Sequence, residues 1–298
     1  MVTKRSAKDY ILDVFLIIIY GLFTLICIFP FYFILMNTIS DNAAVASGQV
    51  LFFPTGIHFT NYLQVFQLRG LHNAAIVSVA RTVIGTLVAV AGASLMGYAI
   101  SKPEYWARKF WYRFIIVTMY FNAGLIPWIL NMRTLGLANS FLAYILPAIS
   151  IPFYIILVKT YIESIPTALE EAAEIDGAGY LKRYLMIALP LSKPILATIA
   201  VFSAVAQWNS FMDTVYLMTD ESLFTLQFVL YRYLNEASQL AELMRRNTSF
   251  GDVIASRAIT PVAVRFTVAS VTIVPILLTY PFFQRYFEKG IMLGAVKG

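Results

Sequence analysis

Six long stretches without a charged residue limit what this chain can fold into. Each runs for 18 to 25 residues, and they are Val14 to Met36, Thr82 to Ser101, Phe114 to Met132, Thr134 to Val158, Ile195 to Met212 and Phe266 to Gln284. A helix of that length crosses a hydrocarbon core of about 30 Å and satisfies every backbone polar group within itself. The sequence therefore predicts an all-α membrane protein with six transmembrane helices.

The composition supports a membrane location and excludes several other classes of protein. Of the 298 residues, 59% are hydrophobic and 13% are charged, and the mean hydropathy is +0.73, which is far from the values of soluble domains. The net charge of +6 does not indicate nucleic-acid binding, because the charges flank apolar stretches instead of forming a basic face. One cysteine and two histidines cannot build a Cys/His zinc site. We therefore expect no metal or cofactor in this chain.

The placement of Lys and Arg orients the six predicted spans. With six spans both termini share one side, and cytoplasmic loops carry the excess of basic residues. Cytoplasmic termini place 14 of the 22 basic residues inside, namely Lys4, Arg5, Lys8, Lys102, Arg108, Lys109, Arg113, Lys159, Lys182, Arg183, Lys193, Arg285, Lys289 and Lys297. Six fall outside, namely Arg69, Arg133, Arg232, Arg245, Arg246 and Arg257. Both termini are therefore predicted to be cytoplasmic, and residues 1–298 to form a single membrane domain.

The cytoplasmic segment 161–194, between the fourth and fifth predicted spans, carries signals for a short helix. Thr167 and Glu170 have the spacing of a capping box, and Gly177 can end a helix. Residues 168–176 are therefore predicted to form a helix roughly 13 Å long. A second helical stretch is expected from Tyr180 to Ile187 before the fifth span begins.

One face of this short helix has the features of a docking surface. Leu169, Ala172 and Ala173 lie together, and small alanines allow another backbone to approach closely. Three acceptors for basic side chains surround that face: Glu170, Glu171 and Glu174. On spacing alone, a solvated amphipathic connector is the alternative interpretation.

The exact residues of this segment resemble those of a known family. Their spacing reproduces the EAA signature of the membrane subunits of bacterial ABC importers: Glu171-Ala172-Ala173, Gly177, Ile187 and Leu189-Pro190, with Asp176-Gly177-Ala178 as its extended form. The pair Trp208-Asn209 and the tail from Phe287 to Gly298 agree with the oligosaccharide branch, to which the smaller membrane subunit of the maltose importer belongs. The resemblance covers essentially the full length. Variants such as Gly124-Leu125-Ile126-Pro127 favour the subgroup that imports larger or acidic, alginate-like oligosaccharides.

The resemblance implies a transport subunit of the bacterial inner membrane, without catalysis of its own. The coupling helix that seats on a separate ATPase would comprise Glu170, Glu171, Ala172, Ala173, Glu174, Asp176 and Gly177. The sequence contains no G-x-x-x-x-G-K-[ST] phosphate loop, so ATP and Mg²⁺ are expected on a partner ATPase dimer. The other implied partners are a homologous second permease subunit, an extracytoplasmic solute-binding protein, an oligosaccharide and the lipid bilayer.

Polar residues at membrane depth are candidates for a substrate path. They are Trp208, Asn209, Asp213, Tyr120, Asn122 and Arg81. An aromatic ring beside a planar amide suits a sugar. On a continuous helix Asn209 and Asp213 share a face, whereas Trp208 lies roughly 140° from Asp213, so all three converge only if the helix unwinds.

Each of these residues also has a purely structural interpretation. Arg81 can snorkel to the headgroups or pair with an acid of a loop. Asp213 can form a cap or a salt bridge, and Trp208 and Asn209 can serve interfacial placement and interhelical packing. The outer segment from Asp213 to Val264 is expected to contain an amphipathic helix, either facing the binding protein or covering the outer vestibule.

Three other functions compete with an oligosaccharide importer. An ion-coupled secondary transporter needs acids or histidines within its spans, and these are nearly absent here. An intramembrane enzyme needs paired acids, a Ser/His pair or a metal cluster, which the spans lack. An ABC permease for a solute other than a carbohydrate remains open.

Overall fold

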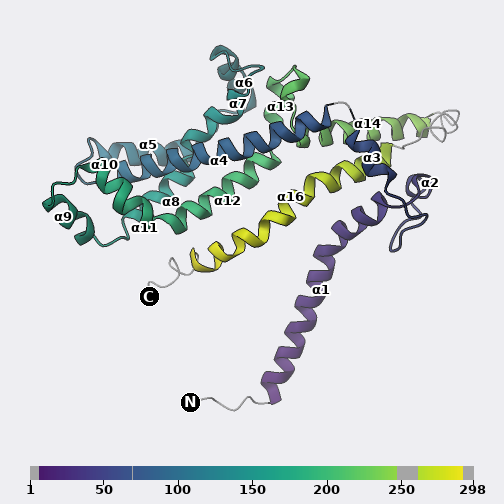
Figure 1. The fold of residues 1–298 in the computed structure, drawn as a ribbon, viewed down its shortest axis with the longest axis horizontal. Helices are drawn as coiled ribbons and strands as arrows, with labels where there is room; N and C mark the ends of the chain where they lie inside the picture. The colour runs from purple at the N-terminus through teal and green to yellow at the C-terminus, as the bar shows by residue number, and fades with distance from the viewer. Residues whose placement is uncertain (1–6, 69, 247–260, 291–298) are drawn as a thin grey trace. The chain divides into compact units, whose positions relative to one another are not determined.

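The computed structural model describes residues 7–68, 70–246 and 261–290, and the regular structure in these ranges is helical (Figure 1). The predicted all-α class is confirmed. The α-helices are α1 (Ala7–Thr38), α2 (Asn42–Ala46), α3 (Thr60–Phe66), α4 (Leu71–Ser101), α5 (Arg108–Tyr120), α6 (Leu125–Thr134), α7 (Leu142–Ile145), α8 (Pro152–Ile162), α9 (Ala168–Ile175), α10 (Tyr180–Arg183), α11 (Leu189–Leu191), α12 (Lys193–Asn209), α13 (Met212–Leu217), α14 (Leu226–Arg246) and α16 (Pro261–Gly290). Three shorter turns join them, namely the 3₁₀ turns η1 (Leu146–Ser150) and η3 (Glu221–Leu223) and the π-helical turn η2 (Tyr184–Ala188).

Three to five helical segments of the described chain are long and apolar enough to cross a membrane. Three qualify on their own, namely Asp9–Thr38, Leu71–Ser101 and Leu142–Ile162. Two more qualify if each bent pair counts as one span: α5 with α6, bent by 118°, and Tyr180–Leu191 with α12, bent by 76°. The apolar part of α16, Val262–Leu278, is shorter. The amphipathic helix expected in the outer segment is confirmed as α14.

The third predicted span, Phe114 to Met132, is wrong as a continuous helix. The helix α5 ends at Tyr120, Phe121 is extended, and α6 starts after Gly124, whose φ is 91°. Glycine adopts such a positive φ without steric cost. The Asn122 Oδ1 accepts a hydrogen bond from the Gly124 N–H at 2.8 Å and stabilises the turn. An uncharged stretch gives no sign of this bend, because both arms are apolar.

The chain divides into two compact units. One comprises residues 1–68 and 232–274, and the other comprises residues 69–231 and 275–298. In the first unit, the Tyr62 hydroxyl is 3.0 Å from both Thr38 Oγ1 and Ser270 Oγ. The rings of Phe33 and Phe266 meet edge to face at 5.7 Å. These contacts join α1, α3 and α16.

The second unit is built around α4, which packs against α8, η1 and α12. Small residues on α4 allow the close approach. A Cβ added to Gly92 would lie 1.9 Å from the carbonyl oxygen of Ile149, and one added to Gly97 would lie 2.8 Å from Val158 Cβ. Small residues serve the same purpose at helix interfaces in membranes, where backbones meet closely. Only glycine fits at position 92 in this arrangement.

Candidate functional site

The short helix predicted in the segment 161–194 is present as α9. Its end is a Schellman motif, in which the Ala178 N–H donates to Ala173 O and the Gly177 N–H donates to Glu174 O, each at 2.9 Å. Gly177 has a φ of 79°, as this motif requires. The following helical stretch continues past the expected Ile187 to Leu191, through the π-helical turn η2.

The predicted capping box at the start of α9 is wrong. Thr167 has helical angles, φ −62° and ψ −28°, and its side chain makes no capping hydrogen bond. An N-cap residue normally lies outside the helical region, so that its side chain reaches the free N–H groups. The other half of the box, Glu170, forms an ion pair with Lys102 instead.

Two of the three glutamates of α9 pair within the chain, and one of them, Glu170, is turned inward. Glu170 accepts from Lys102, which follows α4, and their side chains are only 14% and 16% exposed. Glu174 accepts from Arg183 Nη1 on α10 at 2.7 Å. Charge-assisted hydrogen bonds of this kind are roughly twice as strong as neutral ones. They tie α9 to α4 and to α10, so the basic partners of these two acids come from this chain.

The other face of α9 is open. Leu169 is 47% exposed and Ile175 is 86% exposed, and Glu171, Ala172 and Asp176 are exposed as well. Figure 1 shows α9 as the outermost helix at this end of its unit. Among the described residues, neither Glu171 nor Asp176 at the end of the helix forms an ion pair. The helix thus presents apolar side chains and two carboxylates, and two ion pairs hold it in place from behind.

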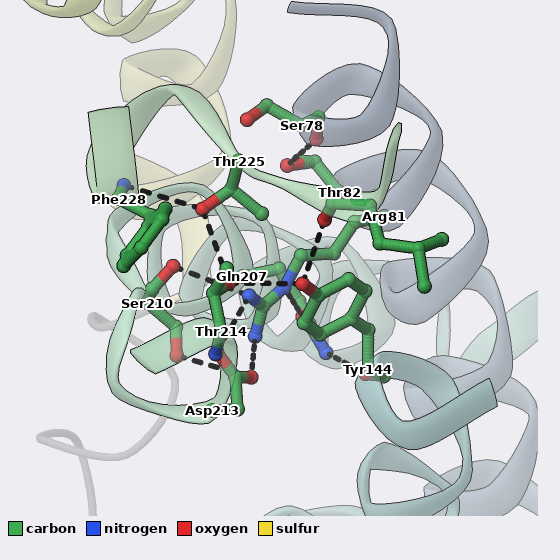
Figure 2. Close-up of polar contacts among 11 residues, drawn as sticks. Ser78, Arg81, Thr82, Tyr144, Gln207, Ser210, Asp213, Thr214, Thr225 and Phe228 are labelled. Atoms are coloured by element: carbon green, nitrogen blue, oxygen red, sulfur yellow. Dashed lines mark hydrogen bonds and ion pairs between the residues drawn. The ribbon is translucent and has the colours of Figure 1, made fainter. Parts of the chain in front are cut away.

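A second polar site lies inside the same unit, around Arg81. This residue of α4 is 3% exposed, and its guanidinium donates to both carboxylate oxygens of Asp213 on α13, with the Nη1 to Oδ1 distance at 3.0 Å. Its Nε donates to Gln207 Oε1 at 2.8 Å, and Nη1 also donates to the Ser210 carbonyl at 3.2 Å (Figure 2). Each guanidinium nitrogen therefore has an acceptor. The snorkelling interpretation of Arg81 is wrong, and its pairing with an acid is confirmed.

Tyr144 covers this ion pair from the α7 side. Its ring centroid lies 4.4 Å from the Arg81 guanidinium carbon, a distance at which a cation is attracted by the ring face. The Tyr144 hydroxyl donates to Leu223 O at 2.8 Å. It also lies 2.9 Å from Thr214 Oγ1 (Figure 2). Together with Gln207, these contacts join α4, α7, α12 and α13 into one polar cluster.

The cluster depends on a break in the helix that carries Asp213. The helix α12 ends at Asn209, Ser210 is extended with a ψ of 134°, and α13 begins at Met212. The prediction that Asn209 and Asp213 share a helical face is therefore wrong, because no helix connects them. The Asn209 Oδ1 accepts instead from Gln227 Nε2 at 3.1 Å, so only Asp213 reaches Arg81.

The remaining candidates for a substrate path lie elsewhere. Trp208 is buried and lines an apolar groove of about 480 Å³ with Val83 and Leu87 of α4. Tyr120 is 79% exposed, and Asn122 stabilises the turn before α6. The structure therefore brings together two of the six candidates, Arg81 and Asp213.

A cavity of about 220 Å³ opens beside the ion pair, and its mostly apolar wall includes several polar side chains. Arg81, Gln207 and Asp213 line it, together with Trp128 and Ser203. The Ser203 Oγ is buried and has no hydrogen-bond partner among the described residues, although buried hydroxyls normally have one. The cavity thus combines an aromatic ring, an amide, a free hydroxyl and a charged pair. In the described ranges, no group of three His, Cys, Asp or Glu side chains is placed to hold a metal.

Sequence reasoning missed two members of this cluster. Gln207 is a polar residue inside an uncharged stretch, directly before Trp208, and that position was a usable signal. Tyr144 is one of 18 tyrosines, and nothing in its neighbourhood distinguishes it. Its role follows only from the packing of α7 against α4 and α13.

Comparisons with known proteins match the chain over most of its length. Residues 85–293 match the family model described as the binding-protein-dependent transport system inner membrane component. A polygalacturonan/rhamnogalacturonan transport system permease protein of Bacillus subtilis is 34% identical, with 94% of this chain and 97% of that protein covered. An arabinooligosaccharides transport system permease protein of Halalkalibacterium halodurans is 26% identical, with 99% and 100% covered. Among solved structures, a chain of a bacterial ABC transporter involved in the import of the acidic polysaccharide alginate superimposes with a TM-score of 0.84 at 30% identity, covering 96% of this chain and 100% of that one.

Proposed function

The chain belongs to the family of binding-protein-dependent transport system inner membrane components, and we propose that it is a permease subunit of an ATP-driven importer of acidic oligosaccharides. One observation carries the substrate class: two relatives of 30% identity or more are named for polygalacturonan/rhamnogalacturonan and for the acidic polysaccharide alginate. The arabinooligosaccharide relative, at 26% identity, makes a neutral sugar the second candidate. Family membership sets the ion-coupled transporter aside.

The proposed topology has six spans with both termini in the cytoplasm, and residues 1–298 form one transmembrane domain. Three long helices and two bent pairs account for five spans, and α16 supplies the sixth. The distribution of Lys and Arg along the sequence supports the orientation. In this proposed orientation, α9 lies on the cytoplasmic side and the loop around α13 lies outside.

The proposed role of α9 is to couple this subunit to a separate ATPase dimer. Its open face offers Leu169, Ala172 and Ile175 to a groove, and Glu171 to a basic side chain. Burial of such apolar surface contributes about 25 cal/mol per Å², and the ion pairs behind α9 would transmit the motion of the ATPase to α4. A homologous second permease subunit and a solute-binding protein complete the assembly.

The proposed substrate path passes the cavity beside Arg81. A uronate carboxylate leaving water requires a charge-assisted partner, and guanidinium offers a bidentate one. Because Arg81 already holds Asp213, the cargo would exchange one carboxylate for another. Ser203 and Gln207 would then hydrogen-bond sugar hydroxyls, and Trp128 would stack against a ring.

Uptake by the assembled importer in vesicles tests this function. The complex with its ATPase and binding protein is expected to accumulate labelled oligogalacturonate when ATP is supplied, with ionophores present throughout. A neutral arabino-oligosaccharide of equal length is the comparison. Uptake of the neutral sugar alone would reject the acidic cargo, and dependence on an ion gradient would reject the ATP-driven mechanism.

A further inference from the structure

A second cavity, of about 500 Å³, lies where the loop after α4 meets α5 and α8. Three basic residues line it, namely Arg108, Lys109 and Lys159, and so do the aromatic residues Tyr105, Phe110 and Tyr112. No acidic residue of the described chain is among its lining residues. Its volume falls within the range of small-molecule sites, so it is a basic pocket large enough for a headgroup.

The residues that line this pocket carry more positive charge than their ion-pair partner carries negative charge. Arg108 and Lys159 both donate to Glu163, the lysine at 2.8 Å, so two cations share one carboxylate. Lys109 is exposed and makes no ion pair with any described residue. Three cations against one acid leave a net charge of about +2, which favours an anion.

Two of the three basic side chains, those of Arg108 and Lys159, are held in place before any ligand arrives. The Arg108 Nε donates to the Ile100 carbonyl at 3.0 Å, which fixes the guanidinium at the end of α4. The Lys159 ammonium lies 4.1 Å from the centroid of the Tyr112 ring, an attractive cation–π distance. Fixed cations lose little conformational freedom on binding.

The surroundings of the pocket are those of a membrane interface. Trp106 is 77% exposed and Phe110 is 60% exposed, next to basic residues at the end of a candidate span, as in interfacial aromatic belts. Farther along α5, Phe114 and Val117 are 50% and 63% exposed and offer an apolar path. A ligand with a phosphate and hydrocarbon chains can fill the basic pocket and also cover the apolar side of α5. A free phosphate can fill only the pocket.

We propose that this pocket binds the phosphate headgroup of an anionic phospholipid, with its acyl chains along the exposed side of α5. Basic pockets between transmembrane helices are known to take such headgroups. The assignment of the lipid to the cytoplasmic leaflet rests on the proposed function and topology. The binding itself rests only on the pocket.

Retention of phosphatidylglycerol by the purified importer complex, measured by native mass spectrometry during delipidation, tests the site. The double variant Lys109→Gln/Lys159→Gln should weaken retention of one lipid by about 25-fold, at about fivefold per lysine. Arg113→Gln is the matched control, because Arg113 is an exposed cation of the same helix that does not line the pocket. Equal losses in both variants, or none in either, would overturn the site.

A second variant, expected to bind phosphatidylglycerol more tightly, tests the site even if the double lysine variant folds poorly. Glu163→Gln removes the acid that neutralises Arg108 and Lys159, so phosphatidylglycerol retention should rise about fivefold or more. Unchanged or weaker retention in this variant contradicts the proposed electrostatics.

A competition experiment identifies the source of the phosphate. Glycerol 3-phosphate carries a phosphate of at least equal negative charge without acyl chains, and millimolar amounts should leave the lipid bound. Its displacement would show a site for soluble phosphates and overturn the lipid. Oligosaccharide uptake is measured separately, after the same purified complex is reconstituted into vesicles. Failed uptake with normal lipid retention counts against the proposed function and leaves this site standing.

Discussion

Arg81 of α4 and Asp213 of α13, 132 positions apart in the sequence, form a bidentate ion pair inside the second unit. Their side chains are 4% and 12% exposed. Moving two charges out of water into the protein interior has a desolvation penalty of several kcal/mol per ion, and their attraction offsets it only when the geometry is good. The pair therefore has a large effect on stability when only one partner is removed, and a smaller one when both are replaced.

Asp213→Asn should destabilise the protein by about 3–5 kcal/mol, because it leaves the Arg81 guanidinium buried without its counter-ion. The double variant Arg81→Met/Asp213→Leu should recover most of that loss and still fail to import acidic oligosaccharides. Thermal unfolding and uptake per folded complex provide the two readouts. Glu221→Gln removes an exposed acid nearby and should alter neither. Normal uptake by the stable double variant would remove Arg81 from the substrate path.

Gly177→Val should uncouple ATP hydrolysis from transport. Gly177 has a φ of 79° and no heavy atom within 4 Å of an added Cβ, so the change acts through backbone strain of about 1–2 kcal/mol. We expect uptake to fall about tenfold, the factor that corresponds to 1.4 kcal/mol, while the isolated ATPase keeps its activity.

Gly179→Val is the matched control for that variant. Gly179 has a φ of −68° and equally open surroundings, so valine fits without strain. If both variants transport alike, the left-handed end of α9 is not needed for coupling.

Gly92→Val should prevent stable folding of the second unit. The added side chain would enter the space of the Ile149 carbonyl, 1.9 Å from the Cβ position, and overpacking of this kind costs about 1–3 kcal/mol or more. Gly21→Ala in α1, where nothing lies within 4 Å, should be tolerated. Expression level and melting temperature of the two variants decide the comparison.

Single cysteines should report the proposed topology. After Cys27→Ser, a cysteine at the exposed position 104 should react with an impermeant thiol reagent only from the cytoplasm. One at the exposed position 235 should react only from outside. Labelling of both positions from the same side would require an even number of spans between them and would contradict the proposed topology. Labelling with the two sides exchanged would mean the opposite orientation.

The sequence allowed prediction of those features that depend on local pattern. Uncharged length indicated the apolar helices, and the spacing from Glu171 to Gly177 indicated α9 and its end. The breaks after Tyr120 and Asn209 could not be predicted, because an apolar segment has the same composition whether it is bent or straight. Contacts between distant residues were equally out of reach. Lys102 meets Glu170, 68 positions away, and no local signal distinguishes that partner from other basic residues.

One helix connects the two sites. Lys102, which pairs with Glu170 of α9, directly follows α4, and Arg81 lies 21 residues earlier on it, roughly 30 Å away at 1.5 Å per residue. No proline interrupts α4 between them. We therefore expect α4 to move as a rigid body. A displacement of α9 that shifts Lys102 along the helix axis would shift Arg81 by a similar amount. A shift of about 1 Å is already enough to break the bidentate geometry with Asp213, because hydrogen bonds weaken within that range.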